Sequence, residues 1–146
     1  MAEEKLAVHA PIEHVWNQMT DAWMYTGWVV GSSHIRGVDP EWPCVGSRIH
    51  HEVGGWPFTI KDFSKVLELD EPRHIVLQAR GWPLFGEARV ELDLSVIEPG
   101  TTLVRMLEQP TNGPGKWLDN PLLEYVLAKR VRECLKRLKT IAENRH

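Results

Sequence analysis

Apolar and polar residues alternate along the middle of the chain in a pattern typical of β-strands. The pattern is clearest in "EARVELDLSVI" (87–97), where five apolar residues share one face: Ala88, Val90, Leu92, Leu94 and Val96. It slips near Asp62 and Phe63, which predicts a bulge there. One face of the predicted sheet is apolar and the other polar, as in an antiparallel sheet with one buried side. In all, the alternation predicts five strands, in the segments 46–53, 58–69, 74–80, 87–97 and 102–109.

Three shorter elements precede these strands. The segment "KLAVHA" (5–10) predicts a strand. Apolar residues at helical spacing predict a helix in "PIEHVWNQMT" (11–20). Asp21 is suited to cap a second short helix in "AWMYTGW" (22–28).

The last predicted element is a long helix. Asn120 is a suitable N-cap and Pro121 a suitable first residue. The apolar stripe of this helix extends over about six turns, or ~30 Å. Its members are Leu123, Val126, Leu127, Val131, Cys134, Leu135, Leu138 and Ile141.

The predicted order is a strand, two short helices, five strands and a long helix, in a single domain of residues 1–146. The apolar face of the sheet needs a cover, and only the long helix is large enough to provide one. We therefore expect an α+β fold in which a curved antiparallel sheet wraps around the C-terminal helix. Because one helix cannot fill the space under a wide curved sheet, we also expect an apolar cavity, closed at one end by the short helices.

Composition and charge narrow the possible functions. Of the 146 residues, 42% are hydrophobic and 25% are charged, which is typical of a globular domain. The net charge of −3 argues against nucleic-acid binding, although the end helix is basic. There is no apolar run long enough to span a bilayer and no secretion signal at the N-terminus, so we expect a cytoplasmic protein. We expect Cys44 and Cys134 to be reduced, core-type residues.

Six segments together resemble a known group of proteins. The segments are "APIEHVW" (10–16), "YTGW" (25–28), "VGSRIHHEVGG" (45–55), "VLELDEPRHIVLQAR" (66–80), "EPGTTLVRMLE" (98–108) and "CLKRLKTIAE" (134–143). They are similar to the START-like (SRPBCC) superfamily, which includes birch-pollen-allergen-like proteins and bacterial polyketide cyclase/dehydrase and lipid-transport proteins. The resemblance covers essentially the whole chain and implies the helix-grip fold. It also implies a hydrophobic cavity for ligands such as lipids, quinones, polyketides or sterols.

Two adjacent histidines lie in the first of the five strands. Neighbouring residues of a strand point to opposite faces, so His50 and His51 are not placed to share one metal ion. His51 shares a face with Ile49 and Val53 and should point into the cavity, whereas His50 should face solvent. We expect no metal site, because the chain has neither an H-E-x-x-H nor a C-x-x-C spacing. His51 is either a hydrogen-bonded core residue or a group that anchors a ligand or transfers a proton.

Four further side chains are candidates for polar groups in the cavity. In one register of the last strand Val104, Met106 and Glu108 face inward, and in the other Arg105 does; the resemblance favours Glu108. Asp62 is either an inward acid at the suspected bulge or a surface residue. Tyr25 is the hydroxyl expected nearest to the mouth of the cavity.

Three functions are compatible with the sequence. The first is binding, transport or sequestration of a small hydrophobic ligand. The second is an enzyme of the polyketide cyclase/dehydratase type, with His51 as base and Tyr25 or Glu108 as donor or orienter. The third is a module that contacts a protein partner or a membrane. We expect no cofactor and either a monomer or a homodimer. For the first function the expected ligand-binding residues are Trp28, Ile49, His51, Val53, Leu77, Val90, Leu92, Met106, Glu108, Leu123 and Leu127.

Overall fold

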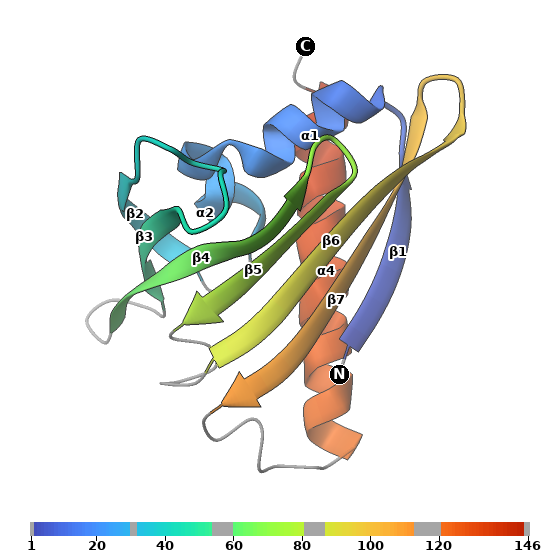
Figure 1. The fold of residues 1–146 in the computed structure, drawn as a ribbon. Coiled ribbons are helices and arrows are strands. Elements are labelled where there is room, and N and C mark those ends of the chain that lie inside the picture. Colours follow the sequence, from blue (N-terminus) through green and yellow to red (C-terminus); the bar gives the residue numbers. More distant parts are fainter. Residues whose placement is uncertain (1, 30–31, 54–59, 81–86, 113–120, 145–146) are drawn as a thin grey trace.

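The computed structural model describes residues 2–29, 32–53, 60–80, 87–112 and 121–144. Seven strands form one curved antiparallel sheet in the order β1-β7-β6-β5-β4-β3-β2, and α4 lies along one face of it (Figure 1). The expected α+β helix-grip fold is thereby confirmed. The elements are β1 (Ala2–Val8), α1 (Ile12–Thr20), η1 (Ala22–Met24), α2 (Tyr25–Trp28), β2 (Ser32–Val38), β3 (Arg48–Val53), β4 (Ile60–Asp70), β5 (His74–Arg80), β6 (Glu87–Glu98), β7 (Thr101–Asn112) and α4 (Pro121–Asn144).

The short helices after β1 form as the sequence predicts. Helix α1 buries Val15, Trp16 and Met19, which are spaced to share one face. Asp21 ends α1 and caps η1, because its side chain accepts a hydrogen bond from the backbone N–H of Trp23 at 3.2 Å. Helix α2 then places Tyr25 and Trp28 in the interior, against α4 and β2.

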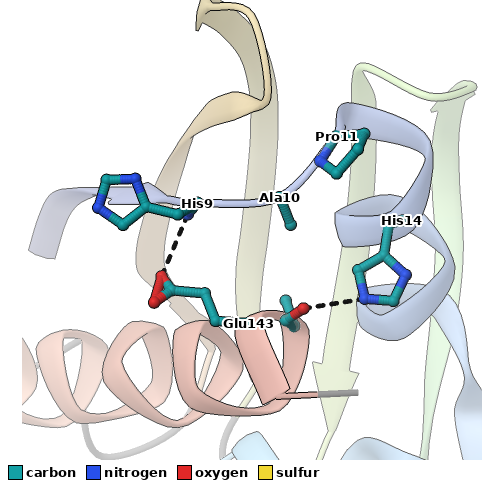
Figure 2. A pocket seen from close by; sticks show the side chains of 6 residues that line it. His9, Ala10, Pro11, His14 and Glu143 are labelled. Atoms are coloured by element: carbon teal, nitrogen blue, oxygen red, sulfur yellow. Dashed lines mark hydrogen bonds between the residues drawn. The ribbon is translucent and has the colours of Figure 1, made fainter. Parts of the chain in front are cut away.

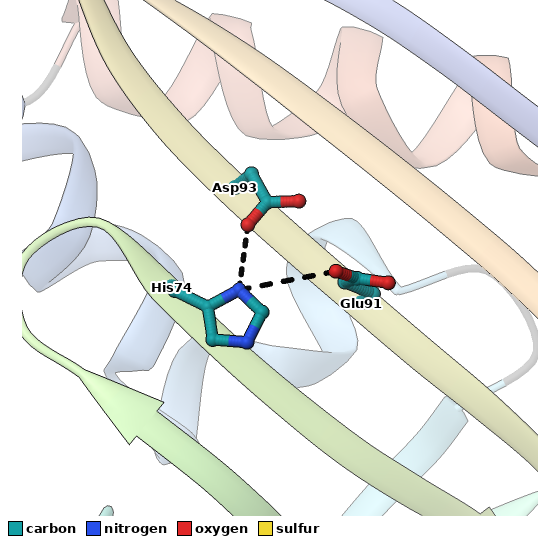
Figure 3. A group of neighbouring side chains, drawn as sticks. All are labelled: His74, Glu91 and Asp93. Atoms are coloured by element: carbon teal, nitrogen blue, oxygen red, sulfur yellow. Dashed lines mark hydrogen bonds and ion pairs between the residues drawn. The ribbon is translucent and has the colours of Figure 1, made fainter.

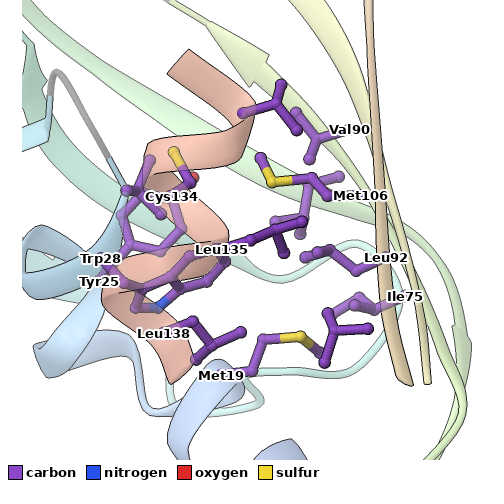
Figure 4. Packing of buried hydrophobic residues seen from close by; sticks show 14 of the residues in the cluster. Met19, Tyr25, Trp28, Ile75, Val90, Leu92, Met106, Cys134, Leu135 and Leu138 are labelled. Carbon is purple, nitrogen blue, oxygen red and sulfur yellow. The ribbon is translucent and has the colours of Figure 1, made fainter. Parts of the chain in front are cut away.

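The core lies between the inner face of the sheet and α4. Strand β6 contributes alternating buried residues as expected, and α4 contributes an apolar stripe that faces them. Figure 4 shows Tyr25, Trp28 and Cys134 on one side of this core, with Ile75, Leu92 and Met106 on the sheet side. In the described part of the chain, no helix is both long and apolar enough to cross a membrane.

Two details of the sheet differ from the sequence-based prediction. Strand β2 was not predicted; among the described strands it lies at the edge of the sheet and pairs with β3. The expected bulge at Asp62 and Phe63 is wrong, because both residues pair regularly with His51 and His50. The irregularity lies instead between Val66 and Glu68, in the pairing of β4 with β5.

Three residues expected in the core are exposed. Val96 lies near the end of β6, where the β6–β7 hairpin extends beyond the helix (Figure 1), and is 59% exposed. Val126 lies in the second turn of α4, at the edge of the apolar stripe, and is 52% exposed. Cys44 is exposed in the turn region before β3, and only Cys134 is a core thiol. The proposed N-cap Asn120 lies outside the described residues.

Candidate functional site

Small side chains form a continuous patch on the inner face of the sheet. Ser64 on β4 pairs with Ala79 on β5, and Ala79 pairs with Ala88 on β6. Residues directly opposite each other in antiparallel strands face the same side, and all three of these are buried. They fill less space than the larger apolar residues that surround them. We call these three residues the small-residue patch.

His51 lies at one end of the small-residue patch. It is 3% exposed, and its Nε2 is 2.9 Å from the hydroxyl oxygen of Ser64. The Tyr25 ring stacks against the imidazole with 6.0 Å between the ring centroids. Burial lowers the pKa of His51 to about 4, although the nearby charge of Asp62 acts in the opposite direction. His51 is therefore an uncharged imidazole at neutral pH.

Glu108 lies on the other side of the small-residue patch. It is on β7, opposite Val90 and one position away from Ala88 along the inner face. Its carboxylate is 1% exposed and forms an ion pair with Arg130 of α4. Burial acts most strongly and lowers the pKa of Arg130. The charge of Glu108 and its hydrogen bond, together with the nearby Cys134 and Tyr25, outweigh burial and raise that pKa overall. The pair therefore brings two opposite charges into the interior between β7 and α4.

The register left open by the sequence is now resolved. Val104, Met106 and Glu108 are buried on the inner face of β7. Arg105 lies on the outer face, where its guanidinium binds Glu3 at 2.8 Å and Asp93 at 2.7 Å. The Arg105 alternative is therefore wrong.

Tyr25 stacks on His51 and also lies near the charges of Glu108 and Arg130. Burial raises the pKa of its hydroxyl, which a hydrogen bond with Ser64 and the charge of Arg130 partly counteract. The charges of Glu108 and Arg130 both act on this hydroxyl, so the ion pair and the His51–Ser64 pair belong to one interior polar region. We call His51, Ser64, Tyr25, Glu108 and Arg130 the interior polar cluster.

Three buried polar atoms in this region are unmatched. His51 Nδ1, Glu108 Oε2 and Trp28 Nε1 have no hydrogen-bond partner among the described residues. Trp28 belongs to the same region, because its ring packs edge-on against Tyr25 with the centroids 5.9 Å apart. A buried polar atom without a partner costs about 1–3 kcal/mol, so such atoms normally meet a water molecule or a ligand.

The other residues expected around the cavity face the core. The structure buries Ile49, Leu77, Val90, Leu92, Met106 and Leu127. Val53 lies at the end of β3 and Leu123 in the first turn of α4, but their side chains lie outside what is described. Asp62 is opposite His51 in the sheet, and its carboxylate lies 3.5 Å from Nε of Arg80.

Ser64 and Arg130 belong to the site but were not identified from the sequence. Ser64 directly follows the position of the expected bulge, where the sequence pattern gave no facing direction. Arg130 lies three residues after Leu127 and four before Cys134, on the buried stripe of α4. Its position in that stripe was a usable signal, since a charge on an apolar helix face needs a partner.

A second group of titratable residues lies on the outer face of the sheet (Figure 3). His74 Nδ1 is 2.6 Å from Asp93 Oδ1 and 4.0 Å from Glu91 Oε1, a spacing compatible with a shared metal ion. The second carboxylate oxygen of Asp93 binds Arg105, and the second carboxylate oxygen of Glu91 binds Arg89. The group is therefore an ion-pair network in which the acidic charges are already matched.

A surface depression of about 270 Å³ lies where the start of α1 meets the end of α4 (Figure 2). His14 Nε2 is 2.9 Å from the carbonyl oxygen of Ala142, and the Glu143 carboxylate accepts a hydrogen bond from the backbone N–H of His9 at 3.1 Å. Glu143 also pairs with Lys139. These contacts join α1 and β1 to the end of α4, which is a structural role.

Comparison with solved structures shows the same fold in several proteins. A START superfamily protein from Mycobacterium smegmatis has a TM-score of 0.76 at 14% identity, with 97% of this chain and 96% of the other covered. The Zhui aromatase/cyclase from Streptomyces sp. R1128 has a TM-score of 0.74 at 18% identity, with 99% and 93% covered. A conserved protein from Geobacillus kaustophilus has a TM-score of 0.74 at 14% identity, with 96% and 93% covered. At these identities the likeness concerns the fold alone.

Sequence comparison gives the family. The search of curated proteins found no match. The sequence model of the family described as "Polyketide cyclase / dehydrase and lipid transport" matches residues 2–143, which is nearly the whole chain. The fold agrees with this match, since START superfamily and aromatase/cyclase proteins share it. The chain therefore belongs to the polyketide cyclase/dehydrase and lipid transport family of START-like proteins.

Proposed function

We propose that this protein binds a small, largely apolar molecule between the sheet and α4, over the small-residue patch. The apolar part of the ligand would pack on the buried residues of β5, β6 and β7, and its polar end would meet the interior polar cluster. Family membership supports a hydrophobic ligand in general, and the identity of that ligand is part of the proposal.

The observation that carries the proposal is the placement of the unmatched atoms. His51 and Glu108 are nearly fully buried, lie on either side of Ala79 and Ala88, and each leave one polar atom without a partner among the described residues. Binding sites typically combine an apolar lining with a few convergent polar groups. A ligand with a polar end would satisfy both atoms and pack against the alanines.

The properties of His51 favour binding over general-base catalysis. A general base works best when its pKa is near the working pH. Burial lowers the pKa of His51 to about 4, so the imidazole is a weak base at pH 7. Its position beside Ser64 and Tyr25 suits it to orient a ligand by hydrogen bonding.

Native mass spectrometry and a fluorescence titration test the proposal. We expect native spectra of the purified chain to show a bound small molecule, and Nile red, a neutral apolar dye, to bind with a 1:1 stoichiometry. The variant Ala88→Leu should weaken dye binding because the larger side chain occupies the patch. Lys65→Leu places the same side chain on the outer face of β4 and should leave dye binding unchanged. Absence of any bound molecule together with failure to bind Nile red would refute the proposal.

A further inference from the structure

We infer that the ligand carries an uncharged hydroxyl group, as in an alcohol or phenol, and that this group binds at Glu108. This inference rests on the proposed function and deepens it by naming the chemistry of the polar end. It follows from two properties of the interior polar cluster and its neighbour Trp28: the balance of the charges, and the kinds of hydrogen bond that the unmatched atoms require.

The charges of the cluster are already balanced. The carboxylate of Glu108 is paired with the guanidinium of Arg130. Asp62, the other acid near His51, lies 3.5 Å from Nε of Arg80. Burial lowers the pKa of His51 and raises the pKa of Tyr25, so both are neutral at pH 7. A ligand carboxylate or phosphate would therefore place an unbalanced negative charge near Glu108, and burying an unbalanced charge is costly.

The unmatched atoms also select for a hydroxyl. Glu108 Oε2 is an acceptor and requires a donor. The indole Nε1 of Trp28 is a donor and requires an acceptor. A hydroxyl group supplies both, because it can donate to the carboxylate and accept from the indole or the imidazole. A carboxylate has no donor, and an ammonium group would add a second cation near Arg130.

Matched pairs of ligands test this inference in the unmodified protein. We would measure binding of 1-naphthol against 1-naphthoate, and of 1-decanol against decanoate, by calorimetry at pH 7.5. We expect the hydroxyl compound of each pair to bind at least about tenfold more tightly, the effect of one hydrogen bond to a charged group. We expect 1-methoxynaphthalene, which lacks the donor, to lose a similar factor. Equal or tighter binding of the acids would overturn the inference.

A charge-changing variant gives a second, independent readout. Glu108→Gln removes one negative charge from the interior, so it should weaken 1-naphthol and strengthen 1-naphthoate. Glu133→Gln makes the same change on the exposed face of α4 and should alter neither affinity. The double variant Glu108→Gln/Arg130→Gln should weaken 1-naphthol without strengthening 1-naphthoate, because it also removes the positive charge that Glu108→Gln alone leaves unbalanced at Arg130. Unchanged selectivity in a folded Glu108→Gln protein, checked by circular dichroism, would contradict the role of Glu108.

The outcomes separate this inference from the proposed function. Binding of Nile red without a preference for hydroxyl compounds would leave the binding function intact and overturn only the hydroxyl inference. Failure of Nile red and of all the paired compounds to bind would overturn both.

Discussion

Ser64 Oγ on β4 lies 2.9 Å from His51 Nε2 on β3, in a part of the sheet where both side chains are nearly fully buried. The hydrogen bond holds the imidazole in one orientation, and the buried Nδ1 has no hydrogen-bond partner among the described residues. A neutral histidine in this position makes the stability of the fold sensitive to acid.

We predict that the free energy of unfolding falls as the pH is lowered from 7 toward 4. The unfolded chain takes up a proton on His51 near pH 6.5, but the folded protein does so only near pH 4. Protonation therefore favours the unfolded state over this range, by on the order of 3 kcal/mol at pH 4. Urea unfolding of His51→Gln should show a correspondingly shallower pH dependence.

His50→Gln is the matched control for this experiment. His50 is the outward neighbour of His51 and lies 2.9 Å from Asp39 Oδ1 at the surface. The same substitution there should leave the acid sensitivity due to His51 in place. An identical pH dependence in His51→Gln and in the unmodified protein would show that His51 is not the group responsible.

We predict that breaking the buried ion pair is strongly destabilising. Glu108→Gln should lower the free energy of unfolding by about 3 kcal/mol, at the low end for buried pairs because the Arg130 side chain keeps 19% exposure. Replacing both residues, as in Glu108→Leu/Arg130→Leu, should cost much less than the sum of the single changes. Urea unfolding of the single and double variants measures this coupling.

An exposed pair on the same helix provides the comparison. Glu133 and Arg137 lie one turn apart on the surface of α4, with Nε and Oε1 3.1 Å apart. Glu133→Gln should cost less than about 0.5 kcal/mol. Equal effects at Glu108 and Glu133 would mean that the interior pair is as well solvated as a surface pair.

We predict that Ala88→Leu is tolerated. In a tightly packed core, added methylene groups cost about 1–3 kcal/mol or more, because neighbouring side chains must move. If the small-residue patch faces open space, the change in the free energy of unfolding should stay below about 1 kcal/mol. Chemical denaturation measures it, and a loss above 3 kcal/mol would show that this region is filled by side chains.

We predict a pH effect of opposite sign for His74. Its hydrogen bond to Asp93 raises the pKa of the imidazole, although burial acts the other way. The interaction therefore stabilises the fold fully below pH 6.5 and is lost as the pH rises through the folded pKa. His74→Gln should cost about 1 kcal/mol at pH 6 and less at pH 9. The exposed His34 serves as control, and a cost that does not vary with pH would contradict the assignment.

The alternation of residues was sufficient to place His51 and the sheet core, because position within a strand decides which face a side chain joins. The alternation was insufficient at the ends of elements. Val96 continues the alternation of β6 but is exposed, because the pattern does not show how far along the strand the helix covers the sheet. Strand β2 was missed because its alternation is weak, with Ile35 between His34 and Arg36. Edge strands such as β2 need less apolar surface than central ones.

The Glu108–Arg130 pair shows a different limit. The two residues lie 22 positions apart on β7 and α4. Their meeting depends on how α4 is rotated about its axis relative to the sheet, which the local pattern of either element does not specify. The alternation within β7 left two registers open for Glu108, and the resemblance to START-like proteins favoured the correct one.

The irregular pairing of β4 changes the parity of that strand. Ser64, Val66 and Leu69 all face inward. In a regular strand Leu69 would face the opposite side, because it is five positions after Ser64 and three after Val66. The extra residue at Leu67 makes this possible, because Leu67 and Glu68 both face outward. Deleting Leu67 would leave Val66 opposite Leu77 and Glu68 opposite Val76 in a regular ladder, so Ser64 and Leu69 would both still face inward. A count of alternate residues back from Leu69 that ignores the insertion would instead place Lys65 inward. The residue that accompanies His51 can therefore be read from this strand only once Leu67 is recognised as the extra one.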